Sequence, residues 1–250
     1  MAGHSKWANI KHRKAASDKK RGKAWSKASH AIIVAARLGG GDIKGNPRLA
    51  MAVHDAKKVN LPGDNIDRAI KRGTGELQGP ETVELVYEGY GPGGVAMVIE
   101  CLTDNRNRTA PDIKHIFDKN GGSFGAQGSV MHTFSRKGII VIRKDKAPEE
   151  ALFDLVVGAG AEDLQSDEEF YTVTTGAAEF EHVKKALEKQ SIITESAELA
   201  YVPSAFNAID HETAVKVQKL LDALDDNNDV QNIYTNHEPP ESFLKQLAES

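Results

Sequence analysis

Apolar residues recur every three or four positions through much of the first eighty residues, which is the spacing of an amphipathic helix. One stripe ends at three glycines, a second follows Asn46 and Pro47, and a third follows Asp64. We expect Asn46 to be the N-cap of the second helix, with Pro47 in its first position. Helices this short are stable only when their faces pack together, so a small helical domain is predicted over about residues 24–75. The first stripe consists of Ala24, Ala28, Ala31, Ile32, Ala35 and Leu38.

From about residue 81 the pattern changes to short strand-like segments separated by turn residues and helices. "VELVYEGYGPGGVAMVIECLT" predicts two strands joined by a Gly-Pro-Gly-Gly turn. "TAPDIKHIFDKNGG" predicts a helix with Thr109 near its cap and Pro111 in its first turn, and "SVMHTF" predicts a strand after it. Near the end of the chain, "HETAVKVQKLLDALDDNND" predicts a helix and "VQNIYTN" a strand.

Residues 135–204 carry a continuous strand-helix-strand-strand-helix-strand series, the order of a ferredoxin-like unit. The elements on either side of this series complete a second α+β layer. We therefore predict the α+β class, with two ferredoxin-like domains of which one is inserted in the other. The expected division is 1–80 for a basic arm and helical domain, 81–134 with 205–238 for one α+β domain, 135–204 for the inserted domain, and 239–250 for a polar tail.

The charge is distributed unevenly along the chain, although its total is only −4. Residues 1–80 contain 17 lysines and arginines against 6 aspartates and glutamates, a net charge of +11, whereas residues 81–250 carry −15. Within the first 27 residues Asp18 is the single acid, and "KHRKAASDKKRGKAWSK" is the most basic stretch. Such asymmetry indicates that the first part of the chain faces a polyanion and that the rest does not.

Several functional classes find no support in the sequence. Cys101 is the only cysteine, so neither an internal disulfide nor a cysteine zinc site can form, and the nine histidines show no metal-ligand spacing. The apolar runs are too short to span a bilayer, and the N-terminus "MAGHSKWANIKHRK" has no apolar segment typical of a signal peptide, so we expect a cytoplasmic protein. The glycine-rich segment 121–129 is either an anion cradle or an ordinary loop. We expect no catalytic residues, no metal or other cofactor, no small-molecule substrate and no membrane partner.

The basic arm is the strongest functional signal, because lysine and arginine side chains displace condensed counterions from nucleic acid. A run of lysines is more often a solvated surface, but here the local charge is almost unopposed. Trp7 has no apolar stripe to join and is predicted to stack on bases, whereas Trp25 is suited equally to stacking and to helix packing. The predicted contacts in this segment are Lys6, Trp7, Lys11, His12, Arg13, Lys14, Lys19, Lys20, Arg21, Lys23 and Lys27.

A second basic cluster lies in "DNRNRT", residues 104–109. Arg106 and Arg108 precede a predicted helix, and the free amide groups of a helix N-terminus favour anions. We therefore include both arginines among the predicted nucleic-acid contacts. The alternative is an internal ion pair with one of the many carboxylates of this chain.

Four segments resemble the YebC/PmpR family, whose organellar relative is the translational activator of cytochrome c oxidase: "MAGHSKWANIKHRKAASDKKRGK", "NPRL", "YEGYGPGGVAMVIECLTDNRNRT" and "NGGSFGAQGSVMHTFSRKG". The resemblance runs from residue 1 to about residue 237. It implies a helical domain followed by two α+β domains, and no catalytic activity. Bacterial members are described as probable transcriptional regulatory proteins that bind DNA, and others resemble ribosome-associated translation factors that help synthesis through consecutive prolines. "KAWSK" at 23–27 departs from the family pattern as regards Trp25.

We therefore expect a non-enzymatic, nucleic-acid-binding regulator of gene expression, acting on DNA in transcription. The alternative is an RNA-binding translation factor with the ribosome as its partner. No helix shows an exposed pattern of base-reading side chains, and this favours RNA, whereas the resemblance favours DNA. An enzyme or ligand-binding protein built on the ferredoxin-like domain would need converging polar residues, and the sequence shows none.

Overall fold

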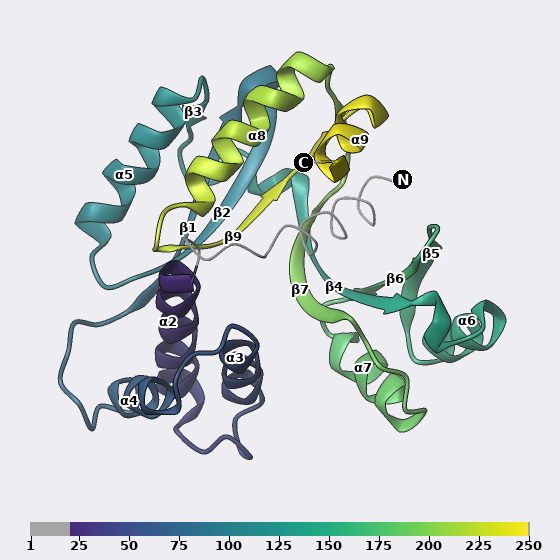
Figure 1. Ribbon diagram of the computed structural model, residues 1–250, viewed down its shortest axis with the longest axis horizontal. Helices are drawn as coiled ribbons and strands as arrows, with labels where there is room; N and C mark the ends of the chain where they lie inside the picture. The colour runs from purple at the N-terminus through teal and green to yellow at the C-terminus, as the bar shows by residue number, and fades with distance from the viewer. Residues whose placement is uncertain (1–20, 250) are drawn as a thin grey trace. The chain divides into compact units, whose positions relative to one another are not determined.

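The computed structural model describes residues 21–249 and confirms the α+β class (Figure 1). The described chain forms two compact units, one comprising 21–130 with 212–233 and the other 131–211 with 234–249. Three helices, within residues 21–73, precede the first strand, as predicted. No helix in the described range is both long and apolar enough to cross a membrane.

Three helices, α2 (Arg21–Gly39), α3 (Pro47–Lys58) and α4 (Gly63–Gly73), pack around a common apolar core. Asn46 is the N-cap of α3, as predicted: its Oδ1 accepts from the amide of Leu49 at 3.1 Å. Its Nδ2 also donates to the carbonyls of Ala35 and Gly40, each at 2.8 Å, so this buried amide joins α2 to α3. Asp64, which the sequence also suggested as the N-cap of the third helix, is not a cap, because α4 begins at Gly63 and has no side-chain cap.

The apolar stripe of α2 differs from the predicted one at its C-terminal end. Leu38 is 64% exposed, whereas Ile33, which lies outside the predicted stripe, is buried. Gly73 at the end of α4 explains the burial of Ile33, because a Cβ there would lie 2.5 Å from the Ile33 carbonyl oxygen. Helix α4 therefore covers a second side of α2. The predicted apolar stripe describes only one buried side of that helix, so it did not include Ile33.

The first sheet has the strand order β3-β1-β2-β9 and lies in the same unit as the three helices. Its strands are β1 (Val83–Gly91), β2 (Val95–Thr103), β3 (Ser123–Phe124) and β9 (Val230–Thr235). Helices α5 (Arg106–Lys119) and α8 (His211–Asp225) cover one face of it (Figure 1). The predicted turn between β1 and β2 is confirmed, as a short 3₁₀ segment, Pro92–Gly94, with φ of 72° at Gly93.

Two local predictions for this sheet are wrong. The predicted strand "SVMHTF" begins as a loop and a 3₁₀ turn, Met131–Thr133, because the carboxylate of Glu88 accepts from the amides of Gly128 and Val130 at 2.6 and 2.8 Å. Because those amides bind the carboxylate, they need no partner in a neighbouring strand. The strand that does form here, β3, lies earlier, within the glycine-rich segment. Helix α5 is capped by Asn105 and not near Thr109, which is its fourth residue.

The second sheet, in the other unit, has the order β5-β6-β4-β7 and confirms the ferredoxin-like prediction. Neighbouring strands in it are antiparallel. Two helices, α6 and α7, share its core through Leu152, Val156, Val183 and Leu187. The elements are β4 (Phe134–Arg143), α6 (Glu149–Gly158), β5 (Ala161–Ser166), β6 (Phe170–Gly176), α7 (Phe180–Lys189) and β7 (Ser196–Pro203).

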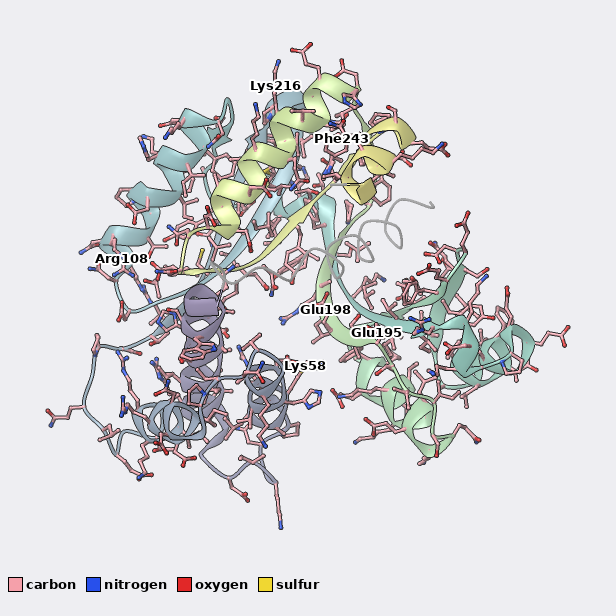
Figure 2. All side chains as sticks on the ribbon, viewed as in Figure 1. Lys58, Arg108, Glu195, Glu198, Lys216 and Phe243 are labelled. Atoms are coloured by element: carbon pink, nitrogen blue, oxygen red, sulfur yellow. The ribbon has the colours of Figure 1, made fainter. Side chains whose placement is uncertain are left out.

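The last residues, predicted to be a polar tail, form helix α9 (Glu241–Glu249). Phe243 of this helix, labelled in Figure 2, is buried and packs edge-on against His211, with ring centroids 5.7 Å apart. A short parallel pair, β8 (Asn207–Ala208) with β10 (His237–Glu238), precedes it. The domain boundaries predicted at 134/135 and 204/205 stay predictions.

Candidate nucleic-acid interface

Most of the predicted interface belongs to the basic arm and lies outside the described residues. This applies to Lys6, Trp7, Lys11, His12, Arg13, Lys14, Lys19 and Lys20. Arg21 and Lys23 fall in the first turn of α2. The contacts of all these residues with nucleic acid stay predictions. For three other predicted residues, Lys27, Arg106 and Arg108, the structure describes the side chain and its exposure.

Lys27 makes an internal ion pair. Its Nζ lies 2.8 Å from Oδ1 of Asp225 at the end of α8, and its side chain is only 19% exposed. The pair joins the start of α2 to the helix that covers the first sheet. The pair and the low exposure together leave Lys27 little access to a phosphate.

Arg108 lies in the first turn of α5, where Figure 2 labels it, and its Nη2 is 2.9 and 2.8 Å from the two carboxylate oxygens of Asp229. Asp229 is 3% exposed, and the hydroxyls of Thr103 and Thr109 lie 3.1 and 2.8 Å from its Oδ2. The hydrogen bond to Asp229 raises the pKa of Arg108 above its usual value. The internal ion pair, which the sequence left open as an alternative, is thus present.

Arg106 differs from Arg108 although both lie in the same helical turn. It is exposed, and within residues 21–249 it has no ion-pair partner. The N-terminal amides of α5 are less available than expected, since Asn105 Oδ1 accepts from the amide of Arg108 at 3.1 Å. Of this cluster, Arg106 is the cation that remains open to an anion.

Further exposed cations on the helical domain extend the predicted interface. They come from the loop before α3, the end of α3, and α4. Each is exposed and, within the described part of the chain, has no ion-pair partner. We call these residues the exposed basic set: Lys44, Lys57, Arg68 and Lys71. The net charge of +11 in the first eighty residues was the signal for them, but spacing alone could not separate them from paired cations such as Lys58, which lies 3.5 Å from Asp55.

Trp25 is a packing residue in this structure. It is partly buried against the core of the three helices, and its Nε1 donates to the carbonyl of Val59 at 3.0 Å. Of the two roles that the sequence left open, the geometry supports helix packing.

His30 of α2 lies close to the Arg108–Asp229 pair. Burial lowers its pKa below 6.5, and the positive charge of Arg72 adds to this, while Asp229, Asp104 and a hydrogen bond with the backbone of Leu102 act in the opposite direction. Its Nδ1 is buried and has no hydrogen-bond partner in the described chain. Neutral histidine is therefore favoured at this position.

The described residues contain no cluster of three or more histidine, cysteine, aspartate or glutamate side chains that could hold a metal ion. Cys101 is buried in β2, and burial raises the pKa of its thiol to about 12. The nucleophilic thiolate is therefore scarce at neutral pH.

A three-helix domain rich in cations, followed by two four-stranded α+β sheets of which one is ferredoxin-like, defines the class of this protein. Residues 5–76 match the family described as "TACO1/YebC protein N-terminal domain", and residues 82–237 match "TACO1/YebC second and third domain". The chain belongs to the TACO1/YebC family, as the resemblance in its sequence predicted.

Full-length relatives agree with this assignment. A "Probable transcriptional regulatory protein" of Persephonella marina is 53% identical over 99% of this chain and 100% of its own length. A protein of the same description from Halothermothrix orenii is 50% identical over the whole of both chains. The crystal structure of a conserved hypothetical protein from Aquifex aeolicus matches with a TM-score of 0.83 and 47% identity, covering 94% of this chain and 97% of the other.

Proposed function

We propose that this protein is a non-enzymatic regulator of gene expression that binds nucleic acid, with DNA as its partner in transcription. The observation that carries the proposal is the segregation of charge, +11 in residues 1–80 against −15 in the remainder. The description of its relatives as probable transcriptional regulatory proteins supports the same role.

Phosphate contact is the mechanism that fits this charge distribution. Each lysine or arginine that meets a phosphate releases condensed counterions, which favours binding without reading the sequence. The arm and the exposed basic set supply such cations, whereas Lys27 and Arg108 are held in internal pairs. The acidic remainder of the chain is repelled by the same polyanion, so the arm and the helical domain supply most of the contact, with Arg106 beside them.

RNA is the second candidate partner, in the role of a ribosome-associated translation factor. A basic arm beside a small helical domain suits irregular RNA, where phosphate contact and stacking matter more than reading a groove. Crosslinking in cells, followed by sequencing of both recovered DNA and RNA, separates the two roles. Enrichment of promoters supports the transcriptional role, and enrichment of ribosomal RNA supports the translational one.

Binding itself is tested with purified protein and fluorescently labelled duplex DNA and folded RNA, by anisotropy between about 50 and 200 mM salt. We expect micromolar or tighter affinity that weakens steeply as salt rises. If neither polymer binds, or if binding is insensitive to salt, the proposed function is wrong.

A further inference from the structure

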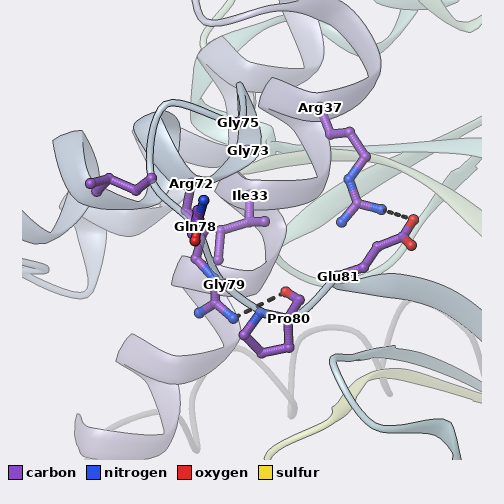
Figure 3. Close-up of a pocket in the computed structure, with 10 residues that line it drawn as sticks. Ile33, Arg37, Arg72, Gly73, Gly75, Gln78, Gly79, Pro80 and Glu81 are labelled. Carbon is purple, nitrogen blue, oxygen red and sulfur yellow. Dashed lines mark hydrogen bonds and ion pairs between the residues drawn. The ribbon is translucent and has the colours of Figure 1, made fainter.

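An open surface pocket of about 510 Å³ lies between α2 and the segment that follows α4. Arg37 and Ile33 of α2 and Arg72 of α4 line it together with Gly73, Gly75 and residues 77–81 (Figure 3). Ligand pockets have volumes of roughly 300–1,000 Å³, so this one is large enough for a nucleotide-sized group. All of these residues belong to one compact unit. We call it the α2–α4 pocket.

Two arginines line the pocket with most of their donors unused. Arg37 donates to Glu81 at 2.8 Å, and Arg72 donates to the carbonyl of Pro80 at 3.2 Å. Arg72 also lies 3.7 Å from Asp104, beyond hydrogen-bond length. A guanidinium carries five N–H donors, and the buried Nε of Arg72 has no partner in the described chain. Gly79 covers this Nε, since a Cβ at Gly79 would lie 2.6 Å from it, so a ligand can reach Arg72 only at its terminal nitrogens.

Glu81 holds Arg37 only weakly. Its side chain is 74% exposed, and an ion pair in such a position contributes about 0–1 kcal/mol. A phosphate oxygen can replace the carboxylate oxygen, because arginine forks bind both groups with two parallel hydrogen bonds. Glu81 therefore competes with an incoming anion.

The pocket also offers apolar and amide surface beside the arginines. Leu77 is 43% exposed, and it lines the pocket with Gln78. An extruded base packs against aromatic or apolar side chains or a guanidinium plane, and its edge is read by hydrogen bonds from polar side chains. Hydrogen-bond donors for a phosphate and an apolar surface for a base thus occur in one pocket.

We propose that the α2–α4 pocket takes one unpaired nucleotide of a bound strand, with the phosphate on Arg37 and Arg72 and the base against Leu77. This inference rests on the proposed function and adds a site that the basic arm does not include. A base in an intact duplex is stacked and paired, and cannot enter. The pocket therefore gives the protein a preference for strands with unpaired bases.

The test measures, by fluorescence anisotropy, the affinity for a labelled single-stranded RNA and for a labelled duplex of the same RNA. Arg37→Ala is expected to lower single-strand affinity about tenfold, the effect of losing a charge-assisted contact. Glu81→Gln is expected to raise it about threefold by removing the competitor, a gain that misfolding cannot produce. Both changes should leave duplex affinity within about twofold, whereas the control Arg68→Ala should lower both affinities alike.

Equilibrium dialysis with adenosine monophosphate, adenosine and inorganic phosphate tests the pocket without any polymer. We expect the wild type to retain the nucleotide better than either adenosine or phosphate. Arg37→Ala should abolish the advantage of the nucleotide over adenosine, because adenosine lacks the phosphate that Arg37 binds. Two results would overturn the pocket proposal and leave the proposed function intact. One is equal retention of the nucleotide and of phosphate in dialysis. The other is a single-strand affinity that neither Arg37→Ala nor Glu81→Gln changes. Failure of the wild type to bind any polymer would instead overturn the proposed function, and dialysis would still decide the pocket.

Discussion

Nη2 of Arg108 lies 2.9 and 2.8 Å from the two carboxylate oxygens of Asp229, a residue 121 positions later in the chain. The carboxylate is buried, and the threonines at 103 and 109 provide its other polar neighbours. This pair joins the start of α5 to the segment that leads into β9. An arginine selected as a ligand-binding residue is thus part of the internal framework of the first sheet.

Arg108→Ala is expected to lower the free energy of unfolding by about 1–3 kcal/mol, because it leaves a buried carboxylate without its charged partner. Urea denaturation followed by circular dichroism measures the change. Arg106→Ala is the matched control, since Arg106 lies in the same turn but is exposed, and it should change stability by less than about 0.5 kcal/mol. Equal effects of the two substitutions would contradict the structural role of Arg108.

His30 is expected to make stability depend on pH. Its pKa in the folded protein lies below the ordinary 6.5, so the unfolded chain binds the proton first as the pH falls. Stability should therefore decrease as the pH falls from about 6.5 through the lower folded pKa, and it should gain nothing from this group above that range. Asp229 and Asp104 oppose the shift, and burial and Arg72 favour it.

The check is the difference between the pH profiles of the wild type and His30→Gln, each measured by urea denaturation between about pH 5 and 8. The variant should lose less stability on acidification. Parallel profiles would show that His30 does not titrate differently in the folded state. Because both curves contain every other titrating group, the difference isolates this histidine.

The basic arm is expected to supply most of the salt-dependent affinity. If about six phosphates are engaged on duplex, log K should fall with log salt at a slope near −5. Replacing Lys19, Lys20, Arg21 and Lys23 by alanine should reduce the magnitude of that slope by about 3 to 4 and weaken binding to all sequences. Anisotropy titrations at several salt concentrations provide the measurement.

Lys185 and Lys189 of α7 provide the control for the arm. Both are exposed and lie in the ferredoxin-like unit, so their replacement by alanine should leave the slope unchanged. An arm variant that binds as tightly as the wild type at moderate salt would show that the arm is not the contact. In that case Arg106 and the exposed basic set become the next residues to replace.

Trp25→Phe is expected to reduce stability by about 1 kcal/mol and to leave nucleic-acid affinity unchanged. Its indole N–H donates to the Val59 carbonyl, and a ring without that donor leaves the carbonyl unpaired. Urea denaturation and anisotropy on the same sample separate the two effects. A loss of affinity without a loss of stability would mean that the ring stacks on a base and does not serve packing.

The sequence was sufficient to predict an element where residues close to it in the chain determine its structure. Asn46 followed by Pro47 gave the start of α3, and the glycines around Pro92 gave the turn between β1 and β2. The ferredoxin-like order followed from a series of short alternating and helical segments that are contiguous in the chain. In each case the residues that decide the element lie within a few positions of it.

The errors in the prediction come from partners that are distant in sequence. Helix α4 approaches α2 at Gly73 and buries Ile33, while Leu38 is left exposed. Glu88 binds amides some forty residues later and so replaces the predicted strand by a turn. The roles of Lys27 and Arg108 likewise depend on carboxylates more than a hundred residues away, which no local pattern indicates.

Strand β2 has β1 on one side and β9 on the other, although β2 ends at Thr103 and β9 begins only at Val230. During synthesis, one edge of this apolar strand therefore stays unpaired while more than a hundred further residues are added, an interval of roughly ten seconds. The ferredoxin-like sheet is contiguous in the chain and can be completed within that interval. A nascent polypeptide that is released before residue 230 keeps an exposed β-edge, which makes premature termination products prone to aggregation.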